Sequence, residues 1–248
     1  MKKRIDTIIN GKGGVGKSFF AVNLVQYLKD KSIPHVAFDT DNANSTLKRF
    51  HPEAAFLDIE DVREIDSIFT ALDKADLVVV DCRAASTDIF LNYFEELQIF
   101  RLLEQAGALM TVVSPVNHET DSVEQIRTLS ERLNDKCNYL IVKNQALSER
   151  FGNYEQSKTR TRLIEQLGAR EIHMAKLYDW LVADLNKNDL TITPAILNES
   201  FTLFDRQRLA NWQRRFYDEL ESVVDILLPP VKKSRKSADE SKPSDLLV

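Results

Sequence analysis

The segment from residue 8 to residue 18 limits what this chain of 248 residues can fold into more than any other feature. An apolar run stops at Asn10, and the six residues that follow include four glycines. Lys17 and Ser18 come next, and a helical pattern of apolar residues begins there. The stretch from Gly11 to Ser18 fits the pattern G-x-x-x-x-G-K-[ST], with a strand before it and a helix after it. The sequence therefore predicts a phosphate-binding loop between a strand and a helix.

The expected chemistry of this loop follows from its glycines and from the helix behind it. Glycines let successive backbone N–H groups turn inward around phosphate oxygens, and the helix N-terminus adds partial positive charge at the same place. Lys17 is expected to reach the β- and γ-phosphates of ATP or ADP, and the Ser18 hydroxyl is expected to ligate Mg²⁺. The residues that we expect to bind the nucleotide are Gly11, Lys12, Gly13, Gly14, Val15, Gly16, Lys17, Ser18 and Phe19.

The composition is typical of a globular protein without a bulk affinity for polyanions. Hydrophobic residues make up 43% of the chain, charged residues 29%, and the formal net charge is −5. Any contact with nucleic acid must therefore come from local basic patches. No apolar run approaches the ~18 residues of a membrane span, and the N-terminus lacks a signal-peptide core, so we expect a cytoplasmic protein without stable membrane anchoring. Cys82 and Cys137 have no spacing that predicts a disulfide or a zinc site.

Strand-like and helix-like segments alternate along the chain, which predicts an α/β fold with a mostly parallel twisted sheet and helices on both faces. The expected strands cover residues 4–10, 35–39, 55–59, 76–81, 108–114, 138–143 and 170–174. The expected helices cover residues 17–30, 62–72, 88–104, 120–133, 157–167, 177–186 and 201–228. Asp121 and Glu124 have the spacing of a capping box for the helix at 120–133. We expect one P-loop domain over residues 1–228.

The C-terminal region combines an amphipathic helix with a polar tail. The apolar stripe of the expected helix at 201–228 should pack on the domain; it consists of Leu209, Trp212, Phe216, Leu220, Val223 and Leu227. Two groups of basic residues either contact DNA phosphates non-specifically or face solvent. They are Arg206, Arg208, Arg214 and Arg215 on this helix, and Lys158, Arg160 and Arg162 earlier in the chain. Residues 229–248, with a basic cluster at 232–236, are expected to be disordered.

Three carboxylates stand at strand ends, where ligands of open α/β sheets bind. Asp39 ends one expected strand and Asp41 follows it by two residues, while Asp81 ends the expected strand at 76–81 after four apolar residues. A carboxylate at this edge can align a water molecule with the γ-phosphate or hold a Mg²⁺-bound water. We expect Asp81 to hold a Mg²⁺-bound water. For Asp39 and Asp41, the alternative is that both are solvated loop residues.

The loop also resembles the deviant Walker A motif of the ParA/MinD ATPases, because a second lysine, Lys12, follows its first glycine. In that family this lysine reaches the nucleotide of a partner subunit, so the resemblance implies a homodimer when ATP is bound. The Asp39-Thr40-Asp41 segment is similar to the family's switch I, which implies that Asp41 orients the attacking water and that Asp39 assists near Mg²⁺. Asn144 matches a position that contacts adenine through its amide, although a turn-forming asparagine is an equal alternative. The resemblance covers about residues 1–145.

The segment after Asp81 departs from the family pattern. Most members have proline and glycine in this switch II, whereas this chain has Cys82-Arg83-Ala84-Ala85. A small-residue stretch here resembles the TraL-type conjugal-transfer and plasmid-stability branch. Whether such a switch II couples hydrolysis to dissociation stays open.

The sequence is compatible with three functions. The first is a dimerising ATPase, slow, Mg²⁺-dependent and stimulated by a protein partner, that acts in plasmid partition, stability or conjugal transfer, with or without DNA binding. The second is a MinD-like membrane-associated positioning ATPase, which needs a basic amphipathic C-terminal helix, whereas the expected helix here ends in acidic residues. The third is a metabolic ATP-dependent enzyme of the same fold.

Overall fold

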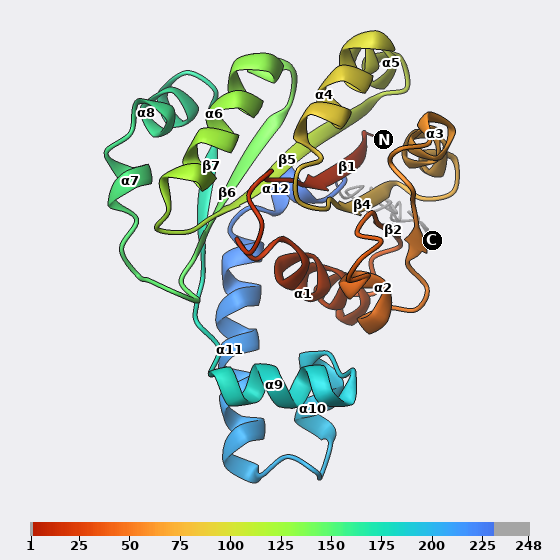
Figure 1. The fold of residues 1–248 in the computed structure, drawn as a ribbon. Helices are drawn as coiled ribbons and strands as arrows, with labels where there is room; N and C mark the ends of the chain where they lie inside the picture. The colour runs from red at the N-terminus through yellow and green to blue at the C-terminus, as the bar shows by residue number, and fades with distance from the viewer. Residues whose placement is uncertain (1, 231–248) are drawn as a thin grey trace, which may run out of the picture.

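A computed structural model describes residues 2–230 of the chain. At its centre is a seven-stranded sheet in the order β3-β2-β4-β1-β5-β6-β7 (Figure 1). The strands are β1 (Lys3–Ile8), β2 (Val36–Asp39), β3 (Ala55–Phe56), β4 (Leu77–Asp81), β5 (Ala108–Val116), β6 (Asn138–Asn144) and β7 (Arg170–Met174). All neighbouring strands are parallel. The predicted α/β fold is confirmed, with a sheet that is entirely parallel in the described residues.

Helices cover both faces of this sheet (Figure 1). One hydrophobic core lies between the sheet and α3 to α8, and the other lies between the sheet and α1, α2 and α9 to α12. The helices are α1 (Lys17–Asp30), α2 (Thr46–Phe50), α3 (Val62–Thr70), α4 (Thr87–Glu96), α5 (Ile99–Gln105), α6 (Thr120–Leu133), α7 (Gly152–Glu155), α8 (Lys158–Glu165), α9 (Asp179–Asn188), α10 (Ile192–Leu197), α11 (Leu203–Glu221) and α12 (Val224–Leu227).

The strand that leads into the phosphate-binding loop lies in the middle of the sheet, because β1 is between β4 and β5. Ile8 is in register with Asp81 of β4 and with Val113 of β5. Asp39 of β2 is in turn in register with Asp81. The parallel strands therefore bring the loop and the predicted carboxylates to the same edge of the sheet, and this edge positions the site.

Several predicted boundaries are wrong. The helix expected at 88–104 is two helices, since Gln98 adopts a left-handed conformation with φ +50° and turns the chain between α4 and α5. The strand expected at 55–59 contains only two paired residues, Ala55 and Phe56, opposite the end of β2. The capping box is also wrong: Glu119 is the N-cap of α6, and no side chain caps this helix.

The C-terminal helix expected at 201–228 is divided between α11 and α12. Its apolar stripe packs as predicted, because all six residues are buried. Arg4 of β1 holds the end of α12 by donating hydrogen bonds to the carbonyl oxygens of Asp225, Ile226 and Leu228, at 2.7, 2.8 and 3.0 Å. Apart from residues 229 and 230, the predicted tail lies outside the described residues.

The helices α9 and α10 and the N-terminal part of α11 extend away from the sheet, below α1 in Figure 1. The short helices α2, α7 and α10, of four to six residues each, are not among the predicted helices. No helix within residues 2–230 combines the length and the apolar character that crossing a membrane requires.

Candidate functional site

The loop between β1 and α1 requires glycine where φ is positive, at Gly14 (φ +74°) and at Gly16. Gly16 is the N-cap of α1 and has φ +100°, in the left-handed region that disfavours L side chains. A Cβ atom at this position would also lie 2.4 Å from Nδ2 of Asn144. A Cβ atom on Gly11 would lie 2.0 Å from Oε1 of Gln125 on α6. The backbone of the loop is thus packed against both β6 and α6, which fixes the direction of its N–H groups.

Lys17 begins α1 and folds back over the loop. Its Nζ donates a hydrogen bond to the carbonyl oxygen of Lys12 at 3.0 Å. Burial lowers the pKa of the Lys17 ammonium, and the negative charges of Asp81 and Asp41 act in the opposite direction. Because a carbonyl oxygen is a weaker partner for an ammonium than a phosphate, the group is available to an anion that enters the loop.

The two switch I carboxylates have different surroundings. Both oxygens of the buried Asp39 accept hydrogen bonds from backbone N–H groups, of Asp41 at 2.9 Å and of Lys48 at 3.0 Å. Asp41 lies nearer the surface, where Asn44 donates from its backbone at 3.2 Å and from its side chain at 3.0 Å. Partial burial acts to raise the pKa of Asp41, but the hydrogen bonds and Lys17 outweigh it, so the pKa is lowered. Asp41 is therefore an ionised acceptor.

Asp81 at the end of β4 is buried, and its two oxygens have no hydrogen-bond partner among the described residues. Burial raises the pKa of this carboxyl to about 8, while the nearby Ser18 hydroxyl and the Lys17 ammonium act to lower it. A buried carboxyl group beside a hydroxyl suits a hard cation such as Mg²⁺, which prefers oxygen ligands, retains water and would favour the ionised form of the carboxyl. The residues present thus fit the predicted metal site at Ser18 and Asp81. Each oxygen of Asp39 accepts one backbone hydrogen bond and keeps a second lone pair, so Asp39 is anchored in switch I beside this site.

A surface pocket of about 310 Å³ opens above these groups. It is lined by Gly13, Gly14, Gly16, Lys17, Ser18, Phe19, Asp41, Asn44, Thr46, Cys82, Arg83 and Ala84. The structure therefore brings the predicted loop, the water-positioning candidate and the switch II segment together around one space. The predicted site residues outside this lining are Gly11, Lys12, Val15, Asp39, Asp81 and Asn144.

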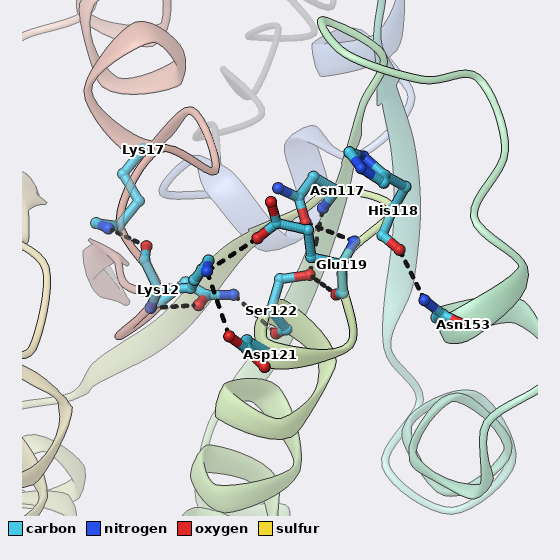
Figure 2. A network of polar contacts seen from close by, with 9 residues as sticks. Lys12, Lys17, Asn117, His118, Glu119, Asp121, Ser122 and Asn153 are labelled. Atoms are coloured by element: carbon cyan, nitrogen blue, oxygen red, sulfur yellow. Dashed lines mark hydrogen bonds and ion pairs between the residues drawn. The ribbon is translucent and has the colours of Figure 1, made fainter.

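The side chain of Lys12 extends toward Glu119 and Asp121 at the N-terminus of α6 (Figure 2). Its Nζ lies 3.0 Å from Oε2 of Glu119 and 3.3 Å from Oδ2 of Asp121. Hydrogen bonds to these carboxylates raise the pKa of Lys12. In this state the second lysine of the loop is therefore paired within its own chain.

Asn10 also links the phosphate-binding loop to α6. From the sequence it is predicted only to end the first strand. Its Oδ1 accepts from the backbone N–H of Lys12 at 3.0 Å, and its Nδ2 donates to the carbonyl oxygens of Pro115 and Ser122, both at 3.0 Å. Asn10 thus ties the loop to β5 and α6. Its position at the end of a strand, directly before the first glycine, was the available signal.

Asn144 packs directly beneath the loop. Its Nδ2 donates to the carbonyl oxygen of Val15 at 2.8 Å, and its Oδ1 accepts from the N–H of Ala146 at 3.0 Å. Both ends of the amide are engaged by the protein, one with the loop and one with the turn that follows β6. The second N–H of this amide and the second lone pair of its oxygen form no hydrogen bond within the described residues, so the amide keeps one donor and one acceptor for a ligand.

The atypical switch II is held to the loop and to switch I by backbone hydrogen bonds. The N–H of Ala85 donates to the carbonyl oxygen of Gly11 at 3.0 Å. The N–H of Arg83 donates to Oγ1 of Thr40 at 2.9 Å, and this hydroxyl donates to the carbonyl oxygen of Asp81 at 3.1 Å. Ala85 has φ +57°, so this chain places an alanine in a conformation that favours glycine.

The predicted DNA-contacting residues are in part engaged within the chain. Arg160 forms a two-bond ion pair with Glu171 at 2.8 and 3.0 Å, and Arg208 pairs with Asp205 at 3.0 Å. Arg214 and Arg215 are exposed and form no ion pair within the described residues. The basic cluster at 232–236 lies outside the described residues.

Comparisons with known proteins agree with this geometry. The family model described as "CobQ/CobB/MinD/ParA nucleotide binding domain" matches residues 6–156. Protein TraL of Escherichia coli is 26% identical over 240 residues, which cover 89% of this chain and 98% of TraL. Protein MobD of Acidithiobacillus ferrooxidans is 24% identical over 230 residues, which cover 90% of this chain and 99% of MobD.

The fold is also similar to that of a solved structure, the septum site-determining protein MinD complexed with Mg-ADP from Pyrococcus horikoshii OT3. The two share a TM-score of 0.53 and 13% identity over 92% of this chain and 99% of the other. The resemblance predicted from the loop, with its TraL-like branch, is confirmed by the family model and the TraL match.

Proposed function

Because this chain belongs to the CobQ/CobB/MinD/ParA nucleotide-binding family, we propose that it is an ATPase switch that forms a homodimer when ATP is bound. Hydrolysis of ATP to ADP and phosphate then returns it to monomers. The observation that carries the proposal is that Lys17 lies near both Asp81 and Asp41, at one edge of the sheet and beside a glycine-rich loop. We also propose that residues 1–228 act as a single domain.

Each group has a role that its surroundings support. The loop N–H groups and the Lys17 ammonium bind the phosphates, because they supply hydrogen-bond donors and positive charge at the N-terminus of α1. Asp41 accepts a hydrogen bond from a water molecule and aligns it with the γ-phosphorus, for which an ionised carboxylate is needed. Ser18 and Asp81 hold Mg²⁺, and Asp39 keeps switch I in place beside it. When bound, Mg²⁺ neutralises charge on the β- and γ-phosphate oxygens.

Dimer formation requires Lys12 to exchange its partners. In the described state its ammonium is paired with Glu119 and Asp121 of the same chain. The role proposed from the family resemblance is that this ammonium contacts the triphosphate of the other subunit. Both pairs are partly exposed, and exposed ion pairs are weak, so a triphosphate can compete for the lysine.

From the likeness to TraL and MobD we propose a role in conjugal transfer or plasmid maintenance. We also propose that the chain acts in the cytoplasm with a protein partner that stimulates hydrolysis. We further propose that the chain contacts DNA without sequence preference. Lys158, Arg214 and Arg215 are the candidates, since they are exposed and without an ion pair in the described part of the chain. An adenine contact by Asn144 is part of the same proposal.

Equilibrium binding of a fluorescent ATP analogue and of ADP tests the function directly. The wild-type chain should bind both with Mg²⁺, and Lys17→Ala should bind neither. Lys12→Ala should bind both but fail to form the ATP-dependent dimer. A purified wild-type chain that ignores adenine nucleotides would contradict the proposal.

A further inference from the structure

Arg83 lines the same pocket as Lys17 and Asp41, in the segment where this chain departs from the family pattern. Lys17 and Arg83 are the two residues with cationic side chains in that lining. Lys12, the other cation of the loop, is engaged with α6. A bound triphosphate would therefore have one further cation within this pocket, and it would come from switch II.

The backbone of Arg83 is fixed while its side chain is free to exchange partners. The hydrogen bond from its N–H to Thr40 places the residue between β4 and switch I. Its guanidinium forms an ion pair with Glu60, whose side chain is 63% exposed, while that of Arg83 is 31% exposed. Glu60 follows β3, whose carboxyl end lies at the same sheet edge as the loop because all these strands are parallel. The guanidinium is thus held beside the pocket by a weak, solvent-exposed partner.

From this arrangement we propose that Arg83 is a catalytic residue that leaves Glu60 and binds the γ-phosphate of the ATP held by its own chain. The inference rests on the ATPase function proposed above. A guanidinium donates two parallel hydrogen bonds to phosphate oxygens, which makes it a stronger and more directional partner than an ammonium. Glu60 holds the same group when no triphosphate is present.

In the hydrolysis step, the oxygen of the attacking water bonds to the γ-phosphorus while the bond to the β–γ bridging oxygen breaks. The electron pair of the broken bond stays on ADP, and the proton lost by the water ends on the phosphate product. Arg83 remains protonated throughout and stabilises the charge that spreads over the equatorial γ-oxygens. It gives no proton to either product.

Arg83→Ala and Arg83→Lys test this role, with Arg132→Ala as the matched control. Arg132 also pairs with one glutamate, Glu95, and its side chain is 35% exposed, but it lies on α6 away from the pocket. Arg83→Ala should lose about tenfold in its preference for a non-hydrolysable ATP analogue over ADP, the loss expected for a charge-assisted hydrogen bond. Its turnover should fall about 10³-fold, which is the lower end for an arginine at a transferred phosphate.

The conservative variants separate this role from a structural one. Arg83→Lys should keep part of the preference for the triphosphate, and Glu60→Gln should raise ATP affinity because the guanidinium is released. The proposal would be overturned if Arg83→Ala and Arg132→Ala showed the same preference for the ATP analogue over ADP. It would also be overturned if Arg83→Ala lost affinity for ATP and for ADP equally. Restored turnover on mixing Arg83→Ala with Lys17→Ala would show that the arginine serves the partner's nucleotide instead.

These outcomes are distinct from failure of the ATPase function. A wild-type chain that binds no ATP would overturn both proposals. A wild-type chain that prefers and hydrolyses ATP, with an Arg83→Ala variant that does the same, would overturn only the role of the arginine.

Discussion

Lys12 and Glu119 form an ion pair within one chain, with Nζ 3.0 Å from Oε2. The pair joins the phosphate-binding loop to the N-terminus of α6, and Asp121 adds a second carboxylate at 3.3 Å. Since the same ammonium cannot serve a second subunit at the same time, the intrachain pair competes with the proposed dimer contact.

Removing this competition should favour the dimer. We expect Glu119→Gln combined with Asp121→Asn to lower the chain concentration needed for the ATP-dependent dimer by a few-fold, because exposed ion pairs contribute little each. Sedimentation velocity with Mg²⁺ and a non-hydrolysable ATP analogue measures the shift. Glu131→Gln is the control, since Glu131 pairs with Arg127 on the same helix. An unchanged dimerisation midpoint would show that the pair does not restrain Lys12.

Gly16→Ala should destabilise the chain for two separable reasons. The positive φ alone costs about 1–2 kcal/mol in an L residue. The Cβ atom would also meet Nδ2 of Asn144 at 2.4 Å. Gly107→Ala isolates the first cost, because Gly107 has φ +64° and no atom within 4 Å of its added Cβ.

Urea unfolding of the two alanine variants measures the difference. The larger loss should be at Gly16, and Asn144→Ala should recover part of it when the two changes are combined, since it removes the atom in the way. Equal losses at Gly16 and Gly107 would contradict the contact.

Ala85→Gly should stabilise the chain. Ala85 has φ +57°, so glycine relieves a strain of about 1–2 kcal/mol, and its greater freedom in the unfolded chain returns about 0.5–1 kcal/mol of that. We expect a net gain of about 0.5–1 kcal/mol in the free energy of unfolding. Ala84→Gly is the control and should destabilise, because Ala84 is not among the residues with positive φ. A loss of stability in Ala85→Gly would contradict the strain.

The buried Asp6 predicts a pH dependence of stability. Neither carboxylate oxygen has a hydrogen-bond partner among the described residues, and burial raises the pKa of Asp6 well above its usual value although Arg4 acts to lower it. The folded state therefore keeps the proton that the unfolded state releases above about pH 4. The stabilisation is complete below that pH and is lost as the pH rises toward the folded pKa.

Asp6→Asn removes the titrating group and with it this pH dependence. Between pH 5 and pH 7, the free energy of unfolding of the variant should rise relative to that of wild type by up to about 1.4 kcal/mol per pH unit. Urea unfolding of both proteins across that range measures the difference in their free energies of unfolding. Because Asp81 titrates in both proteins, its contribution to the pH dependence cancels in this difference. A stability difference that does not change with pH would contradict a protonated Asp6 in the folded state.

The sheet and the loop could be predicted because their signals are local. The glycines of residues 11–16 and the apolar run at 76–81 each define their own conformation, and parallel topology then places Asp39 and Asp81 at one edge. The strand ends therefore predict at which edge of the sheet a ligand would bind. They do not predict the ion pairs and hydrogen bonds that the charged side chains form there.

What the sequence did not reveal depends on contacts between distant segments. Asp121 has the spacing of a cap, yet it faces Lys12, which is 109 residues away. The pairing of Arg83 with Glu60 joins two loops, and the hydrogen bonds of Asn10 reach residues more than 100 positions along the chain. No local pattern encodes such pairings, because they arise only when the strands are ordered in the sheet.

The central claim is that ATP holds two copies of this chain together until it is hydrolysed. Sedimentation velocity of Asp41→Ala with Mg-ATP and with Mg-ADP tests it most directly, because this variant should bind ATP without positioning the water that attacks it. We predict a dimer with Mg-ATP and a monomer with Mg-ADP. A monomer under both conditions, with nucleotide bound, would contradict the account.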